Sequence, residues 1–506
     1  MNVFLMYRDR DFDERAELPI NHQELEQDLE LPTIIEAMAR GDQLVHDVAR
    51  KAVLRSLEDP QAIRYRQEIL TDCLRNPQVA RQLFDLTMES IKRKRESRFA
   101  GFSRYYPSSI LHSSVNLLEL FVDLLRQLRV IAETRGPAFR SEGFRSLFDM
   151  LRRELSEEYL AQVLKILKEL ELRKGVLASA RLGNGNKGAD YVLRRPNLGK
   201  GWLRNLVSKA PATFGFRIAD RDESGSRALS AMRDQGINPV ANALAQSADH
   251  ILSFFNLLRT ELAFYIGCLN LHEELAGKGQ PVCLPDPAAA EERVQDLAGL
   301  YDPSLALTLQ GPVVGSEVQA DGKELIFITG ANQGGKSTFL RSIGVAQLLM
   351  QCGMFVPASR FRANVCSGLF THYRREEDAS MKSGKFDEEL GRMSGIVDQL
   401  RRNSLVLFNE SFSATNEREG SQIARQIVTA LLDERVKVLF VTHMYELAHG
   451  FEDGSARPVL FLRAGRQDDG ARTFKMSEGG PLQTSYGKDL YERIFTTEGP
   501  EQARSA

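Results

Sequence analysis

Cysteine and other marks of a secreted or membrane protein are scarce in this sequence. Only five of the 506 residues are cysteines and none forms a Cys-x-x-Cys pair, which favours reduced, mostly buried thiols over a disulfide or zinc framework. Charges interrupt the longest apolar runs well before about 18 residues, so we expect no membrane span. The opening MNVFLMYRDRDFDE is too short and too acidic for a signal peptide. These absences predict a cytoplasmic protein.

A large excess of charge of one sign is also missing. The chain has 66 Lys and Arg against 68 Asp and Glu, a net charge of −2, which excludes a global polycation. A local basic patch would still suffice to bind nucleic acid. With 26% charged and 42% hydrophobic residues the composition is that of a globular protein, and the length suggests about three domains of roughly 150 residues.

The first 300 residues have a mostly helical texture. After a short segment, 1–30, apolar residues recur at helical spacing through 31–300, which predicts a helical core and lever domain. A long helix is expected after Pro239, ending at Gly277 and Gly279. Within this region, 174–217 is rich in Gly and Asn and then basic around Trp202, which predicts a loop, an inserted hairpin or a reduced clamp.

The texture changes near residue 300. Short apolar runs alternate there with helical segments, at 324–329, 404–408, 437–442 and 458–463. Strands separated by helices predict a largely parallel sheet covered on both faces. The sequence therefore indicates a multidomain protein, with an α/β domain over 301–506 after the helical one.

A phosphate-binding pattern lies at the end of the first of these strands. In FITGANQGGKSTF (327–339), Gly330, Gly335, Lys336 and Ser337 match G-x-x-x-x-G-K-[ST], with a strand before and a helix after. Glycine backbone N–H groups and the helix N-terminus favour a bound phosphate. The pattern predicts a bound nucleotide, with Lys336 on its β- and γ-phosphates and Ser337 on Mg²⁺.

Polar residues follow two further strands. Glu410 is the candidate general base, since an acidic residue after such a strand can polarise the attacking water. Asn409 stands where an Asp is more usual, which predicts weaker Mg²⁺ binding or slower turnover. His443 follows the third strand, where a histidine can contact the γ-phosphate or have a purely structural role.

Four segments, in order and spacing, resemble a known family. TGANQGGKSTFLRSIG, CGMFVPA, the strand ending in Asn409-Glu410 and VTHMYELA are similar to the ATPase domain of the MutS family of DNA mismatch-repair proteins, which are ABC-type ATPases. The resemblance spans about 300–490 and is weaker over 30–300. It implies ATP contacts at Gly330, Asn332, Gly334, Gly335, Lys336, Ser337 and Thr338. It further implies Mg²⁺ contacts at Ser337, Asn409 (through water) and Glu410, and catalytic roles for Glu410 and His443.

The resemblance also implies a homodimer with composite ATP sites. Each site would take a signature segment from the other subunit, here 378–393, in which Phe386 and Glu389 fit the family's F-x-x-E. Ser383 would be the contact to ATP across the dimer. Gly384 and Lys385 follow it where the family has Ser-Thr before the Phe, so a polar helix cap is the alternative role.

The region before the helical core departs from the family. About 30 residues are too few for the domain with which mismatch readers probe DNA, so we expect a truncated MutS-type ATPase that is not a mismatch sensor.

DNA is the expected partner, through two basic stretches with interleaved aromatic residues. Solvated surface is the alternative for both. The candidate contacts are Lys92, Arg93, Lys94, Arg95, Arg194, Arg195, Lys200 and Arg204. None of them would read base identity, so any binding should depend on the structure of the DNA and not on its sequence. We expect a dimer whose DNA binding is controlled by the nucleotide, with a role in repair or recombination. The second hypothesis is an ATPase switch that acts on a protein or ribosomal partner.

Overall fold

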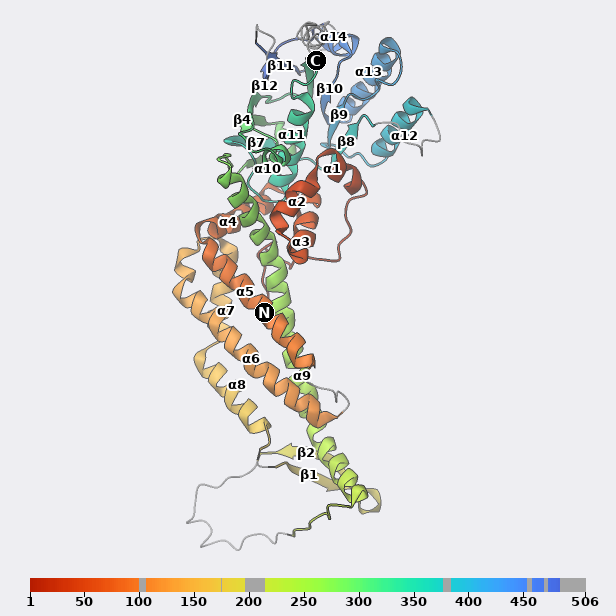
Figure 1. Ribbon diagram of the computed structural model, residues 1–506. Helices are drawn as coiled ribbons and strands as arrows, with labels where there is room; N and C mark the ends of the chain where they lie inside the picture. Colours follow the sequence, from red (N-terminus) through yellow and green to blue (C-terminus); the bar gives the residue numbers. More distant parts are fainter. Residues whose placement is uncertain are drawn as a thin grey trace, which may run out of the picture. The chain divides into compact units, whose positions relative to one another are not determined.

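The chain forms two compact units, which are described separately below (Figure 1). The computed structural model describes residues 1–99, 106–173, 175–195, 214–375, 384–452, 457–467 and 472–482. Unit 1 comprises Met1–Val3, Arg81–Phe139 and Phe144–Arg259, and unit 2 comprises Phe4–Ala80, Arg140–Gly143 and Thr260–Ala506. The domain boundaries expected near residues 30 and 300 follow sequence texture and stay predictions.

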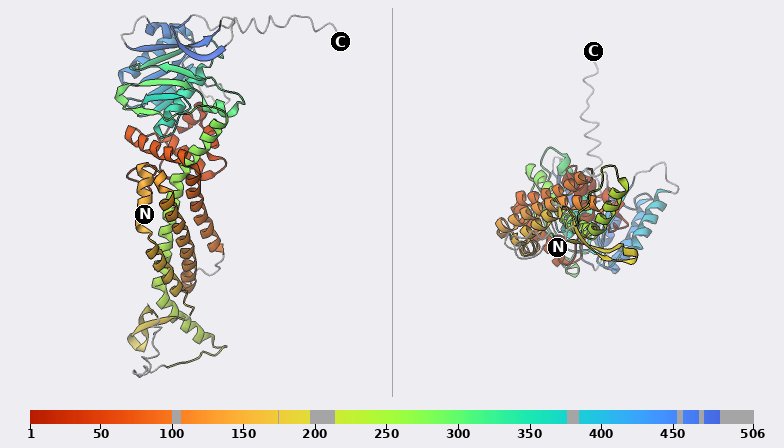
Figure 2. Two further views of the ribbon diagram at one scale, coloured as in Figure 1. Left: turned by 90° about the vertical axis from the view of Figure 1, so that its left-hand side faces the viewer. Right: turned by 90° about the horizontal axis from the view of Figure 1, so that it is seen from below.

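Unit 1 consists of helices and one hairpin, and Figure 2 shows its helices running side by side. The elements of unit 1 are α5 (Pro77–Phe99), α6 (Pro107–Thr134), η1 (Gly136–Ala138), α7 (Glu142–Glu154), α8 (Glu157–Leu170), β1 (Leu177–Leu182), η2 (Asn184–Asn186), β2 (Gly188–Arg194) and the first part of α9 (Glu223–Gly277). Of these, α5, α7 and α9 also include residues of unit 2.

Apolar residues at helical spacing form the core of unit 1, as the sequence predicts. The recurring residues of α6 are all buried: Leu117, Leu118, Phe121, Leu124, Leu125 and Leu128. Phe121 packs on Phe255 of α9, with ring centroids 5.8 Å apart. The packing of such apolar stripes, more than helix propensity, stabilises helices of this length.

The hairpin β1–β2 is antiparallel and lies within the stretch 174–217 for which a loop or hairpin was expected. It turns at Gly185, whose φ of +68° is in the left-handed region that favours glycine. It approaches α9 closely, because a Cβ on Gly236 would lie 3.3 Å from that of Ala178.

The long helix starts earlier than expected. α9 has 55 residues and begins at Glu223, with Pro239 inside it, so a start after Pro239 is wrong, whereas its end at Gly277 is as predicted. A proline inside a helix removes one hydrogen bond and costs about 3 kcal/mol. A helix that continues with its own backbone hydrogen bonds before and after the proline can offset that cost. The residues around Pro239 alone do not indicate this.

Two helices of the described chain are long and apolar enough to cross a membrane by length and composition, α6 and α9. Half of the most apolar stretch of α6 and 67% of that of α9 is buried inside the protein, as in the core helices of a folded domain. The lengths of the apolar runs between charges do not reveal these two helices, because an average over 18 residues tolerates one or two charges.

Unit 2 holds the two larger sheets and the remaining helices. Its helices are α1 (His22–Asp28), α2 (Leu31–Ala39), α3 (Gln43–Leu54), α4 (Pro60–Arg75), the end of α9, η4 (Ala290–Glu292), α10 (Pro303–Thr308), α11 (Lys336–Gln351), α12 (Lys385–Val397), α13 (Glu417–Asp433) and α14 (Tyr445–Glu452). Its strands are β3 (Asp286–Ala288), β4 (Gln295–Leu300), β5 (Ser316–Gln319), β6 (Leu325–Gly330), β7 (Arg360–Asn364), β8 (Leu369–Tyr373), β9 (Leu405–Asn409), β10 (Lys437–Val441), β11 (Val459–Arg466) and β12 (Arg472–Glu478).

The six-stranded sheet confirms the expected α/β arrangement. Its order is β12-β11-β6-β10-β9-β8, and all neighbours are parallel except β11 and β12. The four predicted strands are β6, β9, β10 and β11. Phe327, Phe408 and Phe440 pack on the side of α13 and α14, while Gly344 of α11 lies against Leu407 on the other side. The coarse fold prediction, a helical part plus an α/β part, is therefore confirmed.

A second sheet, with the order β3-β7-β4-β5, was not predicted. Its strands have three to six residues and are mixed in direction, too short for a clear pattern in the sequence.

Residues 4–14 form an irregular segment that we call the strap. Glu261 of α9 accepts hydrogen bonds from the backbone N–H groups of Leu5, Met6 and Phe12. The fully buried Arg66 donates to the carbonyl oxygens of Met6 and of Cys352, which follows α11. The strap is therefore fixed by side chains from α4 and α9 instead of by a sheet.

Candidate nucleotide-binding site

The loop between β6 and α11 has a backbone that requires glycine. Gly330 and Gly335 have φ values of +109° and +87°. A Cβ on Gly334 would lie 2.7 Å from that of Ala464 and 2.9 Å from the carbonyl oxygen of Ala331, closer than real Cβ contacts. Asn332, another predicted contact, is exposed on this loop. The glycine spacing therefore reflects both the turn and the close approach of β11.

Lys336 is the first residue of α11 and is buried. Its Nζ donates to the carbonyl oxygens of Gly330, at 3.0 Å, and Ala331, at 2.9 Å, so the side chain folds back across the loop. The pKa of Lys336 is lowered to about 8, mainly by burial; Glu410 opposes this shift and the charge of Arg472 adds to it. An anion inside the loop would relieve the desolvation of this ammonium group.

Two predicted Mg²⁺ contacts meet at the edge of the sheet. The Oγ of Ser337, in the first turn of α11, donates to Oδ1 of Asn409 at the end of β9, at 2.8 Å. Nowhere in the described ranges do three or more His, Cys, Asp or Glu side chains gather in a way that could hold a metal. A hydroxyl and an amide oxygen fit Mg²⁺ that takes its other ligands from phosphate and water.

Glu410 and His443 lie in contact. Nε2 of His443 is 3.1 Å from Oε1 of Glu410. This hydrogen bond is the main cause that holds the pKa of Glu410 below its usual value, against burial and with help from Lys336 and Arg374. Glu410 has a φ of +56°, and its N–H donates to the carbonyl oxygen of Val441, so the chain turns sharply after β9. An ionised carboxylate held in this way is suited to accept a proton.

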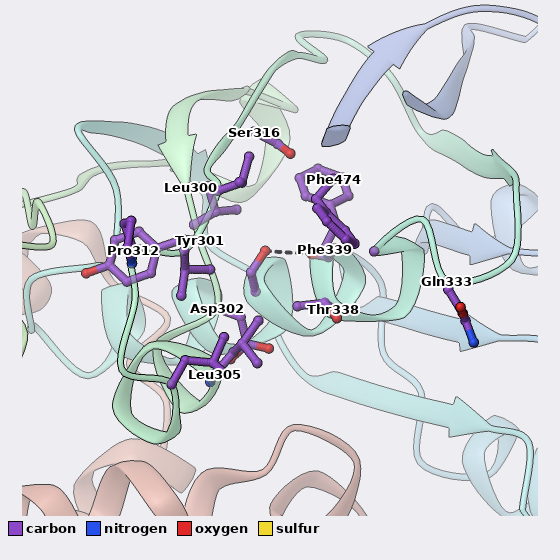
Figure 3. A pocket seen from close by; sticks show the side chains of 15 residues that line it. Leu300, Tyr301, Asp302, Leu305, Pro312, Ser316, Gln333, Thr338, Phe339 and Phe474 are labelled. Carbon is purple, nitrogen blue, oxygen red and sulfur yellow. Dashed lines mark hydrogen bonds between the residues drawn. The ribbon is translucent and has the colours of Figure 1, made fainter. Parts of the chain in front are cut away.

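A cavity of about 440 Å³ opens beside the loop (Figure 3). The predicted residues Gly335 and Thr338 line it. Most of its wall consists of residues that the sequence did not single out: Leu300, Tyr301, Leu305, Leu309, Pro312, Val313, Val314, Phe339 and Phe474. An apolar cavity with a few polar groups is the usual form of a small-molecule site.

Phe474 of β12 is the most unusual residue of this wall. Its φ is +58°, its side chain is half exposed, and its carbonyl oxygen lies 3.7 Å from the position that a Cβ on Gly335 would take. A bulky residue with positive φ is rare, and such strain collects at functional sites. No sequence pattern marks this residue, because its place depends on the pairing of β12 with β11.

The signature segment is described only in part. Ser383 lies outside the described residues, so its role at the partner's ATP stays a prediction. α12 begins at Lys385, Phe386 packs against the core beneath the sheet, and Glu389 is buried. Burial raises the pKa of Glu389. The F-x-x-E residues of this segment therefore point into unit 2.

The predicted DNA contacts differ from one another in their surroundings. On α5, Nε of Arg93 is 2.6 Å from Glu89, and Nζ of Lys94 is 3.1 Å from Asp249. The other two predicted contacts on this helix are exposed, Lys92 and Arg95.

On and after β2 the predicted contacts also have partners. Arg194 donates to Oγ of Ser179 at 2.9 Å, and Arg195 pairs with Glu169. Lys200 and Arg204 lie outside the part of the chain that the structure describes.

Comparison with known proteins points in one direction. The family model of the MutS2 N-terminal domain matches residues 58–278, and that of MutS domain V matches residues 326–497. MutS protein homolog 4 of Mus musculus is 25% identical over 293 residues, covering 56% of this chain and 30% of that protein.

Bacterial relatives match shorter segments. DNA mismatch repair protein MutS of Chloroflexus aurantiacus is 29% identical over 253 residues, 48% of this chain and 26% of that protein. The protein of the same name from Thermus aquaticus is 34% identical over 168 residues, 33% of this chain and 20% of that protein. The matched regions are less than a third of these relatives' lengths. The two domain matches, together with these relatives, show that the chain belongs to the MutS family.

Proposed function

We propose that this chain binds and hydrolyses ATP with Mg²⁺ at the edge formed by the β6–α11 loop, Asn409, Glu410 and His443. The observation that carries the proposal is the meeting, at one edge of one sheet, of residues far apart in the sequence. Ser337 reaches Asn409, and Glu410 reaches His443. Membership of the MutS family, a family of ATPases, supports it further.

The chain's own groups suggest how hydrolysis would proceed. The backbone N–H groups of the loop and the ammonium group of Lys336 would hold the phosphates. Glu410 would accept a proton from the attacking water, whose oxygen bonds to the γ-phosphorus as the bond to ADP breaks. His443 orients the carboxylate. Mg²⁺, held by Ser337 and by Asn409 through water, would neutralise charge on the phosphates.

The apolar cavity supports a place for the nucleoside. It shares Gly335 and Thr338 with the loop, so a triphosphate in the loop would leave its base and ribose beside this wall. Phe474 and the segment Pro312–Val314 offer the apolar surfaces on which a purine stacks. They are therefore candidate base contacts.

We further propose DNA as the partner of a nucleotide-gated dimer, without mismatch specificity. The exposed Lys92 and Arg95 and the family of the chain support this. The ion pairs of Arg93 and Lys94 favour the second candidate, an ATPase switch on a protein or ribosomal partner, since paired side chains bind phosphates less readily.

ATP turnover by wild type and Glu410→Ala, with duplex, junction and single-stranded nucleic acids as stimulants, tests the proposal. We expect the wild type to hydrolyse ATP and Glu410→Ala to lose at least about 100-fold in kcat while it still binds nucleotide. Glu434→Ala, at an exposed position after α13, is the matched control. Equal rates for wild type and Glu410→Ala would refute the catalytic assignment.

Fluorescence anisotropy with the same nucleic acids, with and without ATP, separates the two partner hypotheses. Binding that weakens steeply with salt supports DNA. If no probe binds at low salt, the DNA proposal fails. An ATPase rate indifferent to DNA together with a stable protein complex would support the switch.

A further inference from the structure

Arg374 extends the catalytic edge beyond the residues that the family motifs mark. In the register of the sheet, Asn409 pairs with Tyr373 of β8 on one side and with Val441 of β10 on the other. Arg374 follows β8 directly, and its backbone N–H donates to the carbonyl oxygen of Asn409, at 2.9 Å. The strand ends therefore place Arg374 and His443 on opposite sides of Glu410.

Each oxygen of the Glu410 carboxylate has one of these basic side chains beside it. Nε2 of His443 is 3.1 Å from Oε1, and Nη1 of Arg374 is 4.0 Å from Oε2. The side chain of Arg374 is 44% exposed and that of Glu410 is 32% exposed. A partly exposed ion pair at this distance contributes little to stability, because solvent screens it. Folding alone therefore gives little reason for an arginine here.

The other charges at this edge of the sheet give a functional reason for an arginine at position 374. Asn409 is neutral, and Glu410 would meet a negatively charged triphosphate held by Lys336. Without a second cation, the carboxylate would be repelled by the phosphates, since like charges close together repel strongly near a protein surface. Arg374 is a cation on the far oxygen of Glu410 and would offset this repulsion.

The two other arginines near the end of β8, Arg375 and Arg392, interact with other groups. Nη2 of Arg392 donates to the carbonyl oxygen of Tyr373, at 3.0 Å, and the charge of Arg375 acts on the half-buried Asp28. Among the described arginines that follow β8 or contact it, Arg374 is the one that pairs with Glu410.

We propose that Arg374 is a positioning residue for ATP hydrolysis, which holds Oε2 of Glu410 while His443 holds Oε1. The inference rests on the proposed ATPase function. In the step that it serves, Glu410 takes one proton from the attacking water, the water oxygen bonds to the γ-phosphorus, and the bond from that phosphorus to ADP breaks. Arg374 exchanges no proton and keeps the carboxylate directed at the water.

Steady-state kinetics of Arg374→Ala and Arg374→Lys test the proposal, with Arg402→Ala as control. Arg402 is an exposed arginine before β9, at the opposite edge of the same sheet. We expect Arg374→Ala to lower kcat about 10- to 100-fold with KM changed by less than about threefold, because positioning acts on the chemical step. Arg374→Lys should be intermediate, and added guanidinium should partly restore Arg374→Ala. Thermal melting should be unchanged.

A double-mutant cycle shows whether Arg374 acts through Glu410. In a Glu410→Gln background, Arg374→Ala should lower the remaining rate by less than about twofold. A loss as large as in the wild-type background overturns the positioning role, and so does wild-type kcat in Arg374→Ala. If the wild type itself does not hydrolyse ATP, the proposed function fails, whereas turnover in the wild type with an unaffected Arg374→Ala overturns only the role of Arg374, so the two failures are distinguishable.

Discussion

The two units of this protein differ in where they keep their charges. Among the described residues, every fully buried charged side chain lies in unit 2: Arg66, Asp72, Glu261, Asp302, Lys336, Glu389 and Lys437. In the described part of unit 1, the buried polar side chains are three hydroxyls, those of Thr87, Ser90 and Ser114. Its charges lie at the surface, many of them in ion pairs such as Arg126 with Glu157.

The two units therefore differ in how strongly their stability depends on individual charged residues. A buried charge is costly unless it is hydrogen-bonded or paired, and Arg66, Asp72, Glu261, Asp302 and Lys336 each have such a partner in unit 2. A surface pair contributes about 0–1 kcal/mol and can be exchanged with little loss. We therefore expect single substitutions of these buried charged residues of unit 2 to have large effects, and substitutions of the surface charges of unit 1 to have small ones.

The largest expected effect is that of Lys336→Ala. Lys336 would replace its two bonds to loop carbonyls by charge-assisted bonds to phosphate, each contributing about 1.5–3 kcal/mol. ATP affinity should fall about 100-fold or more, as measured by titration with a fluorescent ATP analogue. Lys165→Ala, at an exposed position on α8 of unit 1, should bind like the wild type. Similar ATP affinities of Lys336→Ala and Lys165→Ala would contradict the expected difference between buried charges of unit 2 and surface charges of unit 1.

Glu261→Gln should change how stability depends on pH. Burial raises the pKa of Glu261 to about 7, above its usual 4.5, although three backbone N–H groups oppose the shift. The folded state therefore binds this proton more tightly, and the associated stability, up to about 3 kcal/mol, is full below pH 4.5 and lost as the pH rises through about 7.

Urea unfolding between pH 4.5 and 8 measures this effect. Between pH 4.5 and 8 the free energy of unfolding should decline less in the glutamine variant than in the wild type. At acid pH the variant should be less stable than the wild type, because its amide accepts fewer hydrogen bonds. Glu36→Gln, at an exposed position on α2, should keep the wild-type dependence. An unchanged slope in Glu261→Gln would show that Glu261 is not the titrating group.

Asn409→Asp should strengthen Mg²⁺ binding. A carboxylate adds negative charge beside Ser337, where the amide now accepts a hydrogen bond. The Mg²⁺ concentration for half-maximal ATP hydrolysis should fall by about 10-fold, since affinity for such ions rises with ligand charge. Unchanged Mg²⁺ dependence and turnover would contradict the idea that Asn409 weakens this site.

The smallest effect is expected in unit 1. The double variant Lys92→Ala/Arg95→Ala removes two exposed charges and should reduce the salt dependence of DNA binding by a slope of about 2, with only a few-fold loss of affinity. Arg93→Ala/Lys94→Ala removes two paired charges and should have a weaker effect. Equal effects of the two variants would show that ion pairing does not decide which basic side chains contact DNA.

Sequence reasoning succeeded where the constraint is local. The strand, glycine loop and helix around Lys336 are continuous in the chain, and the strands ending in Asn409 and Val441 are short, unbroken apolar runs buried on both faces. Parallel pairing then brings their ends to one edge, so the meeting of Ser337 with Asn409 follows from pattern and topology together.

It failed where long-range packing decides. Phe474 reaches the cavity through the pairing of β12, and the strands of the second sheet are too short to show a period. The start of α9 was missed because Pro239 reads locally as a helix boundary. Arg374 drew no attention since an arginine after a strand is common, and only the register places it beside Glu410.

The strap has a consequence for the order in which the chain is made. Leu5 and Met6 bond to Glu261, more than 250 positions later, and Arg66 bonds to the carbonyl of Cys352, 286 positions after itself. At roughly 5–20 residues per second, a ribosome exposes the strap for about 10–50 s before its partner on α9 has been synthesised. Val3, Leu5, Met6 and Phe12 are buried in the finished protein and would be open to chaperones throughout that interval. Nascent chains stalled before residue 261 should therefore bind chaperones through these first residues, and chains stalled well beyond Cys352 should release them.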